Sequence, residues 1–283
     1  MIFDILMKFA LNFPNFGDYS NPKVLAELAR EAEKAGWDGF FLWDHMTFEK
    51  GSNIPFVDPW VALSAIAMKT ENISIGTWVT PLPRRRPWKV ARETVSIDHL
   101  SDGRLILGVG LGAPDYEFIA YGEDVDPRIR AQKLDEALQI LTGLWSGELF
   151  KFNGKHYNLK EITFLPQPIN GHIPIWVAGM WPNKKPFQRA ARYDGVCPIN
   201  ANIPDKLTPS DLRDIIKYME KYREGNNKFD IIIAGETPLD SEKGVEIVKP
   251  YAEAGATWWN EYINGWRGSF KEMRERIRKG PPK

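Results

Sequence analysis

Histidine is scarce in this chain, and one of its four histidines stands where a catalytic group is expected. His45 directly follows the short apolar segment 39–43, which ends in Trp43, and its neighbour is the carboxylate Asp44. Imidazole takes up and releases protons near neutral pH, and a nearby carboxylate favours the charged ring. His45 is therefore the candidate acid or base, with an ordinary surface histidine as the alternative. No two histidines have the spacing of metal ligands, so we predict no metal site.

Two glycine-containing segments offer backbone N–H groups to an anion. Gly179-Met180 precedes Lys184 and a predicted helix, an arrangement that favours a phosphate. The pattern Gly108-x-Gly-x-Gly, which includes Gly110, is a weaker phosphate signal, because glycines there also allow a tight turn. The run Arg84-Arg85-Arg86, stiffened by flanking prolines, is either solvated or binds a polyanionic cofactor tail.

The elements that must position these residues alternate along the chain. Short, continuous apolar runs are each followed by an amphipathic helical pattern, and the first two helices open on the pairs Asn21-Pro22 and Asp58-Pro59. The predicted strands cover residues 8–13, 39–43, 73–79, 105–109, 173–178, 195–199, 229–234 and 256–262. The later helices are predicted at 88–99, 129–145, 187–193, 209–222, 242–254 and 270–279.

Eight such cycles predict the α/β class, with a closed (β/α)₈ TIM barrel as one domain over residues 1–283. Residues 147–172 interrupt the rhythm between the fourth helix and fifth strand, and Asn153-Gly154 predicts a hairpin within this insertion. Catalytic side chains of such barrels lie just past the C-terminal ends of the strands. Asn12, Asn260 and Glu261 occupy or adjoin such ends, as does His45.

The composition excludes several classes of protein. Lys plus Arg and Asp plus Glu both number 37, so no net charge attracts nucleic acid or an anionic membrane. No stretch approaches 18 apolar residues, and the N-terminus lacks the pattern of a signal peptide. The single cysteine, Cys197, excludes an internal disulfide and suits a reducing compartment. We therefore expect a cytoplasmic protein.

Several segments in a fixed order carry a family resemblance. Residues 75–87, 98–104, 107–112, 152–157 and 173–179 resemble the luciferase-like monooxygenase family, within a match that runs from about residue 9 to 195. The resemblance implies a (β/α)₈ barrel that binds reduced FMN, or the deazaflavin coenzyme F-420, at the C-terminal ends of its strands. It also implies that His45 is the active-site histidine.

The resemblance further implies roles for residues around the cofactor. The Trp78–Val79 peptide matches the position of a nonprolyl cis peptide that bulges against the flavin ring, and Gly179-Met180 matches a loop whose amides hold the cofactor phosphate. Gly110 and Lys184 are assigned to the cofactor with them. Glu117, Arg128 and Arg130 match positions near the pocket rim, and we assign Glu117 and Arg128, together with Trp43, to the substrate. Trp78 departs from the family, because many relatives carry a small residue there.

Three functions follow from these observations. The first is an FMN-dependent monooxygenase acting on a small organic substrate, as a homodimer supplied with reduced flavin by a separate reductase. The second is hydride transfer with coenzyme F-420, which needs no oxygen. The third, from another class, is a flavin-binding protein without catalytic activity, against which the presence of His45 argues.

Overall fold

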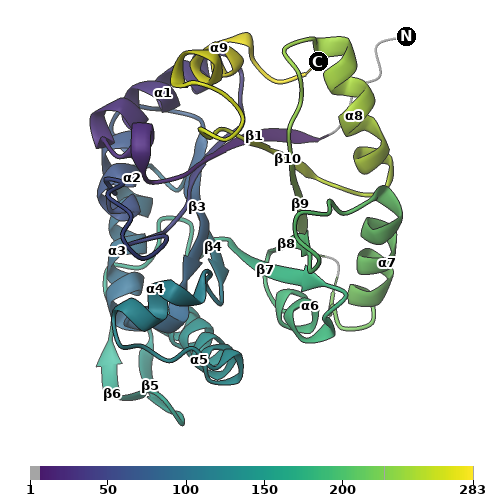
Figure 1. The fold of residues 1–283 in the computed structure, drawn as a ribbon. Coiled ribbons are helices and arrows are strands. Elements are labelled where there is room, and N and C mark those ends of the chain that lie inside the picture. Colours follow the sequence, from purple (N-terminus) through teal and green to yellow (C-terminus); the bar gives the residue numbers. More distant parts are fainter. Residues whose placement is uncertain (1–6, 226, 283) are drawn as a thin grey trace.

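A computed structural model describes residues 7–225 and 227–282 of the chain. Eight parallel strands close into a barrel in the order β1-β10-β9-β8-β7-β4-β3-β2, as Figure 1 shows. This confirms the predicted (β/α)₈ fold. The barrel strands are β1 (Lys8–Phe13), β2 (Gly39–Leu42), β3 (Ser74–Pro81), β4 (Leu105–Gly110), β7 (Ile175–Trp181), β8 (Gly195–Asn200), β9 (Asp230–Gly235) and β10 (Trp258–Tyr262).

Helices cover the outside of the barrel (Figure 1). Two of them begin as predicted, because the side chains of Asn21 and Asp58 each accept a first-turn backbone N–H at 2.9 Å and a proline follows. The helices of the ring are α1 (Pro22–Lys34), α2 (Pro59–Ala67), α3 (Pro87–Leu100), α5 (Pro127–Trp145), α6 (Lys184–Ala190), α7 (Pro209–Met219), α8 (Ser241–Glu253) and α9 (Phe270–Lys279). None of the helices in the described ranges is both long and apolar enough to cross a bilayer.

An additional short helix, α4 (Asp115–Ala120), stands between β4 and α5 and was not predicted. Its six residues are too few to show a helical period in the sequence. It matters because it carries Glu117, which is buried.

The strands divide the apolar side chains between two layers. Alternate residues point outward against the helices, and the others point into the barrel. The inward set forms one cluster that fills the lumen, with Trp78 and Ala178 packed against it: Ala10, Phe41, Ile106, Trp176, Cys197, Ile232 and Trp258. The lumen is thus a packed core, and chemistry is confined to the ends of the barrel.

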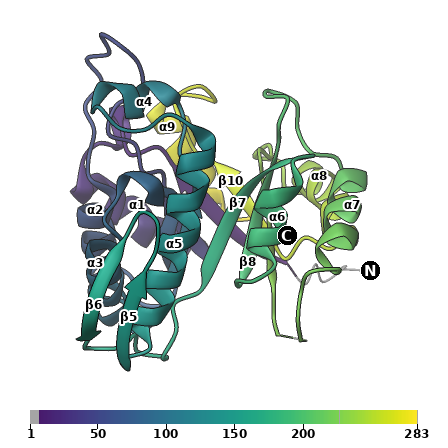
Figure 2. The same ribbon diagram turned by 90° about the horizontal axis from the view of Figure 1, so that it is seen from below.

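The insertion contains the predicted hairpin, formed by β5 (Leu149–Asn153) and β6 (Asn158–Thr163). Its turn is held by α5, because the Glu136 carboxylate accepts the backbone N–H groups of Lys155, His156 and Tyr157 at 2.8–3.0 Å. Figure 2 shows the hairpin lying along α3 and α5, in the helical layer of the molecule.

One predicted boundary is wrong in a way that bears on the site. We expected the fifth barrel strand to end at residue 178, but β7 continues to Trp181. Gly179, Met180 and Trp181 pair with Pro198, Ile199 and Asn200 of β8, and this pairing extends the strand past the glycine. Helix α6 then begins at Lys184, three residues earlier than predicted.

Candidate active site

The loop after β2 carries His45 to the C-terminal end of the barrel, where Asn15 holds its backbone. The Asn15 side chain accepts the His45 N–H at 3.1 Å and donates to the His45 carbonyl at 2.7 Å. The same amide nitrogen donates to the Val57 carbonyl at 2.7 Å. The wholly buried Asn15 therefore fixes the loop that presents the histidine.

The imidazole of His45 meets a buried carboxylate from α4. Its Nδ1 lies 3.2 Å from Oε2 of Glu117, which also receives Nη1 of Arg84 at 2.6 Å. The other oxygen, Oε1, accepts the N–H groups of Met46 at 2.5 Å and Thr47 at 3.0 Å. Burial raises the pKa of the Glu117 carboxyl, but the bonds and charges of His45 and Arg84, with the Met46 N–H, lower its pKa below the ordinary value.

An ionised Glu117 determines which nitrogen of His45 is free. A carboxylate only accepts hydrogen bonds, so Nδ1 must donate to it and Nε2 of the neutral ring carries the lone pair. No hydrogen bond to Nε2 is formed by the residues that the structure describes, and 18% of the His45 side chain is exposed. The pair can therefore act as a general base toward a molecule at the mouth of the barrel.

Two of the three arginines of the run, Arg84 and Arg85, fit neither interpretation of it. Arg84 and Arg85 are neither solvated nor free to bind a cofactor tail, because they pair with Asp44, whose side chain is wholly buried. Arg85 binds that carboxylate through two bonds of 2.9 and 2.5 Å, and Arg84 bridges Asp44 and Glu117. Arg86 is exposed. Asp44 thus neutralises two arginines, and of the possibilities that its adjacency to His45 left open, raising the basicity of the ring or pointing away from it, the structure shows the side chain turned away, into the protein.

Aromatic rings surround His45. The ring centroids of Phe48, Trp43 and Phe16 lie 5.3, 5.9 and 6.2 Å from its own, all at steep angles. Trp43, a predicted substrate residue, is held in place because its Nε1 donates to Oδ1 of Asn12 at 3.0 Å.

The structure brings part of the predicted cofactor site together. The Trp78–Val79 peptide is cis, as predicted. Trp78 is half-buried on the lumen cluster, and a Cβ on Gly110 would lie only 2.9 Å from Cγ2 of Val79. Gly110 therefore allows β3 and β4 to approach at the point where their register shifts. Its assignment to the cofactor remains a prediction.

The predicted phosphate segment precedes Lys184 and a helix, as expected, but Gly179 and Met180 themselves lie within β7 and not in the first turn of α6. Their assignment to the cofactor phosphate remains a prediction. A Cβ on Gly179 would meet Pro186 and Phe187 of α6 at 3.0 and 3.2 Å, so this position faces the helical layer. The ammonium of Lys184 lies 3.4 Å from the ring centroid of Trp181, where it forms a cation–π contact.

The two other predicted rim residues lie apart from His45. Arg128 is exposed on the first turn of α5, and no contact among the described residues joins it to the His45 group. Arg130 is buried, pairs with Asp115 at 2.7 Å and covers the ring of Phe118. Its role there is to attach α5 to α4.

Sequence reasoning missed three residues that shape the site. Asn15 and Trp266 were not singled out, and Arg84 was considered only as a member of a charge run. A polar residue one or two positions after a strand end was the available signal for Asn15. The pairing of Arg84 has no local signal, because its partners Asp44 and Glu117 are distant in the sequence.

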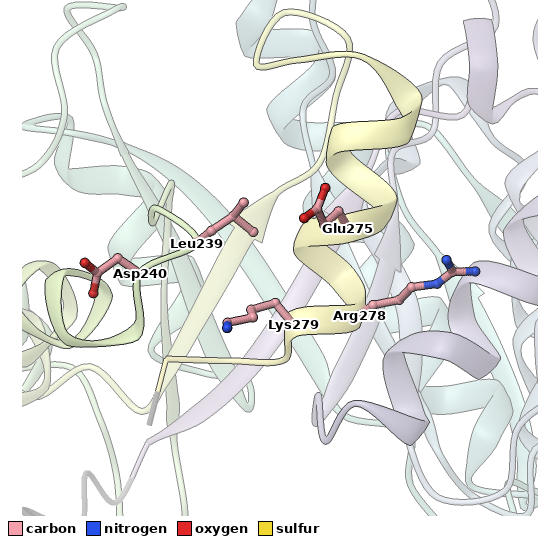
Figure 3. Close-up of a pocket in the computed structure, with 5 residues that line it drawn as sticks. All are labelled: Leu239, Asp240, Glu275, Arg278 and Lys279. Atoms are coloured by element: carbon pink, nitrogen blue, oxygen red, sulfur yellow. The ribbon is translucent and has the colours of Figure 1, made fainter.

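Two cavities lie outside the barrel, away from this group. One of about 550 Å³ lies between α9 and the residues that lead into α8, and Figure 3 shows Glu275 and Lys279 on the Leu239 side of α9. Arg278 extends to the other side, where it pairs with Glu31 on α1. The other, of about 870 Å³, is lined by residues of α5, α6 and the chain beyond α7. Over the described ranges, no three His, Cys, Asp or Glu side chains gather as metal ligands would.

Comparisons with known proteins agree with this architecture. The chain is 28% identical over 256 residues to the oxygenase component of flavin-dependent trigonelline monooxygenase from Acinetobacter baylyi, covering 89% of this chain and 67% of that protein. It is 33% identical over 164 residues to the F420-dependent glucose-6-phosphate dehydrogenase of Microbacterium testaceum, covering 57% of this chain and 48% of the relative. The chain thus spans about half to two thirds of these relatives.

A solved structure extends the likeness to the whole fold. An F420-dependent secondary alcohol dehydrogenase, in complex with an F420-acetone adduct, superposes with a TM-score of 0.81 at 18% identity, covering 98% of both chains. The model of the luciferase-like monooxygenase family matches residues 7–272. The barrel, its histidine-bearing mouth and this match over nearly the whole chain identify the protein as an oxidoreductase of the luciferase-like monooxygenase family.

Proposed function

We propose that this protein oxidises a small alcohol, or reduces the corresponding carbonyl compound, by hydride transfer with coenzyme F-420. The observation that carries the proposal is the His45–Glu117 pair, in which a buried ionised carboxylate leaves Nε2 of the histidine as a proton acceptor. Removing the proton of an alcohol is the task of such a base.

The chain's own residues perform the proton half of this reaction. As the substrate C–H bond breaks, the hydroxyl proton passes to Nε2 of His45, and the positive charge on the imidazole is balanced by Glu117 at 3.2 Å. Asn15 keeps the histidine in place, and Arg84 keeps the carboxylate ionised. When bound, coenzyme F-420 would supply the electron chemistry, as hydride acceptor for the alcohol and hydride donor for the carbonyl compound.

Two features of the barrel mouth fit a flavin-type ring. The half-buried indole of Trp78 offers an apolar surface over the lumen cluster. Asn260, on the same face of β10 as the lumen residue Trp258, is wholly buried, and its side-chain nitrogen and oxygen have no hydrogen-bond partner among the described residues. Buried polar groups are normally paired, so these atoms suit a ring edge that carries donors and acceptors.

The second candidate is the monooxygenase reaction with reduced FMN, which the sequence placed first. It is favoured by the likeness to the trigonelline oxygenase component, which extends over 89% of this chain. In that case the partner is a separate flavin reductase, because that relative is named as the oxygenase component alone of its monooxygenase. The His45–Glu117 pair leaves Nε2 as a proton acceptor, which the alcohol reaction uses directly, and for this reason we place the alcohol reaction first.

Cofactor titration followed by turnover tests the proposal. The protein is titrated with oxidised F-420 and with reduced FMN, and the tighter complex is then supplied with small alcohols. Tighter binding of F-420 and oxygen-independent oxidation of an alcohol are expected. Tighter binding of FMN with oxygen consumption would instead support the second candidate.

The variant His45→Ala separates catalysis from cofactor binding. The catalytic rate should fall by about 10² to 10⁴, which is typical when a general base is lost. Cofactor affinity should change little, because no predicted cofactor contact is removed. A variant with the rate of the native protein would contradict the acid–base role, and the absence of turnover in both proteins would support the non-catalytic alternative.

A further inference from the structure

The loop between β10 and α9, residues 263–269, displays a large aromatic side chain at the barrel mouth. Trp266 is 68% exposed, although its ring lies 6.0–6.1 Å from the rings of Phe16, Trp43 and Phe48. Trp266 and Trp43 are near-parallel, with 22° between their planes. Trp266 thus leaves most of its apolar surface accessible at the edge of a group of aromatic rings.

The backbone that carries Trp266 is anchored on both sides. Nη1 of Arg267 lies 2.6 Å from both the wholly buried Glu261 carboxylate and the Tyr262 carbonyl. Oδ1 of Asn264 accepts the N–H groups of Trp266 and Arg267 at 3.1 Å each. Because these bonds hold the backbone of Trp266 before any ligand arrives, less entropy is lost on binding.

The polar groups beside these rings are already engaged. Oδ1 of Asn12 accepts from Trp43, and its Nδ2 donates to two carbonyls of β10. Asn15 makes three bonds to neighbouring backbone. A substrate with many hydroxyls would find few partners there, and unpaired polar groups in a closed site reduce affinity. Apart from the buried Asn260 amide, which the proposed function assigns to the cofactor ring, flat apolar surfaces and the free Nε2 of His45 remain.

We propose that Trp266, with Trp43 and Phe48, forms an aromatic wall that binds the ring of an aromatic alcohol and directs its hydroxyl to His45. This inference rests on the proposed function and names its substrate class. Aromatic rings attract one another beyond simple burial, and beside Trp266 the Trp43 ring is near-parallel at 22° and the Phe48 ring is tilted at 43°. Trp266 is in this view a specificity residue, which acts on substrate binding and leaves the proton transfer to His45.

The experiment compares benzyl alcohol with 1-butanol, which share a primary hydroxyl and differ in the ring. Isothermal titration of the cofactor-loaded protein gives both dissociation constants, for the native chain and for Trp266→Ala, Trp266→Phe and Trp88→Ala. Trp88 is the matched control, because it is a partly exposed tryptophan on α3 beside the hairpin. Since Trp266 is largely exposed, its variants should fold, which thermal unfolding verifies.

We expect the native protein to bind benzyl alcohol at least tenfold more tightly than 1-butanol, a difference of about 1.4 kcal/mol. Trp266→Ala should abolish this preference by raising the dissociation constant of benzyl alcohol, Trp266→Phe should retain most of it, and Trp88→Ala should not alter it. An undiminished preference in Trp266→Ala, or equal binding of the two alcohols to the native chain, would overturn the inference.

Turnover separates this inference from the proposed function. If neither alcohol is oxidised but the binding preference depends on Trp266, the hydride-transfer proposal is wrong and the aromatic wall stands. If both alcohols are oxidised with equal kcat/KM in the native protein and in Trp266→Ala, the reaction stands and the wall is refuted.

Discussion

Replacing Glu117 by glutamine tests the arrangement on which the proposed reaction depends. The side chains have the same shape, but one carboxylate oxygen becomes an NH₂ group. Oε1 of Glu117 accepts two backbone N–H groups, and Oε2 accepts from His45 at 3.2 Å and Arg84 at 2.6 Å. A glutamine that keeps the backbone bonds must turn its NH₂ toward His45 and Arg84, which are donors themselves.

The loss is expected in both stability and rate. Removing one partner of a buried ion pair costs about 3–5 kcal/mol, and the lower end applies because Arg84 keeps Asp44. At about 2–4 °C per kcal/mol, the melting temperature should fall by about 6–12 °C. The catalytic rate should fall by about 10² to 10³, because His45 loses the carboxylate that selects its tautomer and balances its charge.

Acid conditions provide an internal check. The pKa of Glu117 is lowered in the folded protein, so its charge stabilises the fold above the ordinary carboxyl pKa, and this contribution disappears as the pH falls through the folded value. The stability difference between the native protein and Glu117→Gln should therefore be full at pH 7 and shrink below about pH 4.5.

Urea unfolding across this pH range, with turnover measured on the same preparations, provides the data. The control is Glu161→Gln, which removes an exposed ion pair with Lys151 and should cost at most about 1 kcal/mol. A Glu117→Gln protein with native rate and stability would refute the reasoning, and a loss of stability that does not depend on pH would refute the charge assignment.

Three further predictions concern other parts of the molecule. Gly179→Ala should lower the stability by about 1–3 kcal/mol in thermal unfolding, because the new Cβ would press on α6. An unchanged stability would show that residue 179 does not pack against α6. Bonds from Arg274, with those from Arg278, lower the pKa of Glu31 to about 2. Glu31→Gln should therefore lower the free energy of unfolding by about 1 kcal/mol at pH 7, and this loss should vanish as the pH falls from about 4.5 to about 2. A loss that urea unfolding shows to be the same at every pH would contradict this. Light scattering should show a particle of twice the chain mass if the expected homodimer forms, and a monomer would refute that expectation.

The sequence determined much of the architecture by itself. Continuous apolar runs alternating with amphipathic patterns predicted each barrel strand, and the pairs Asn21-Pro22 and Asp58-Pro59 marked where helices begin. These features are local, because strand burial on both faces and helix capping depend on neighbouring residues. Position after a strand end also placed His45 at the mouth of the barrel, and family resemblance located the Trp78–Val79 peptide.

What only the tertiary structure decided is which residues meet. His45 and Glu117 lie 72 positions apart, and the unpredicted helix α4 brings the carboxylate to the histidine. Asp44, adjacent to His45 in the sequence, turns instead to Arg84 and Arg85. Ion pairs between distant segments have no periodic signature, since they arise only after the barrel has closed and burial forces each charge to find a partner.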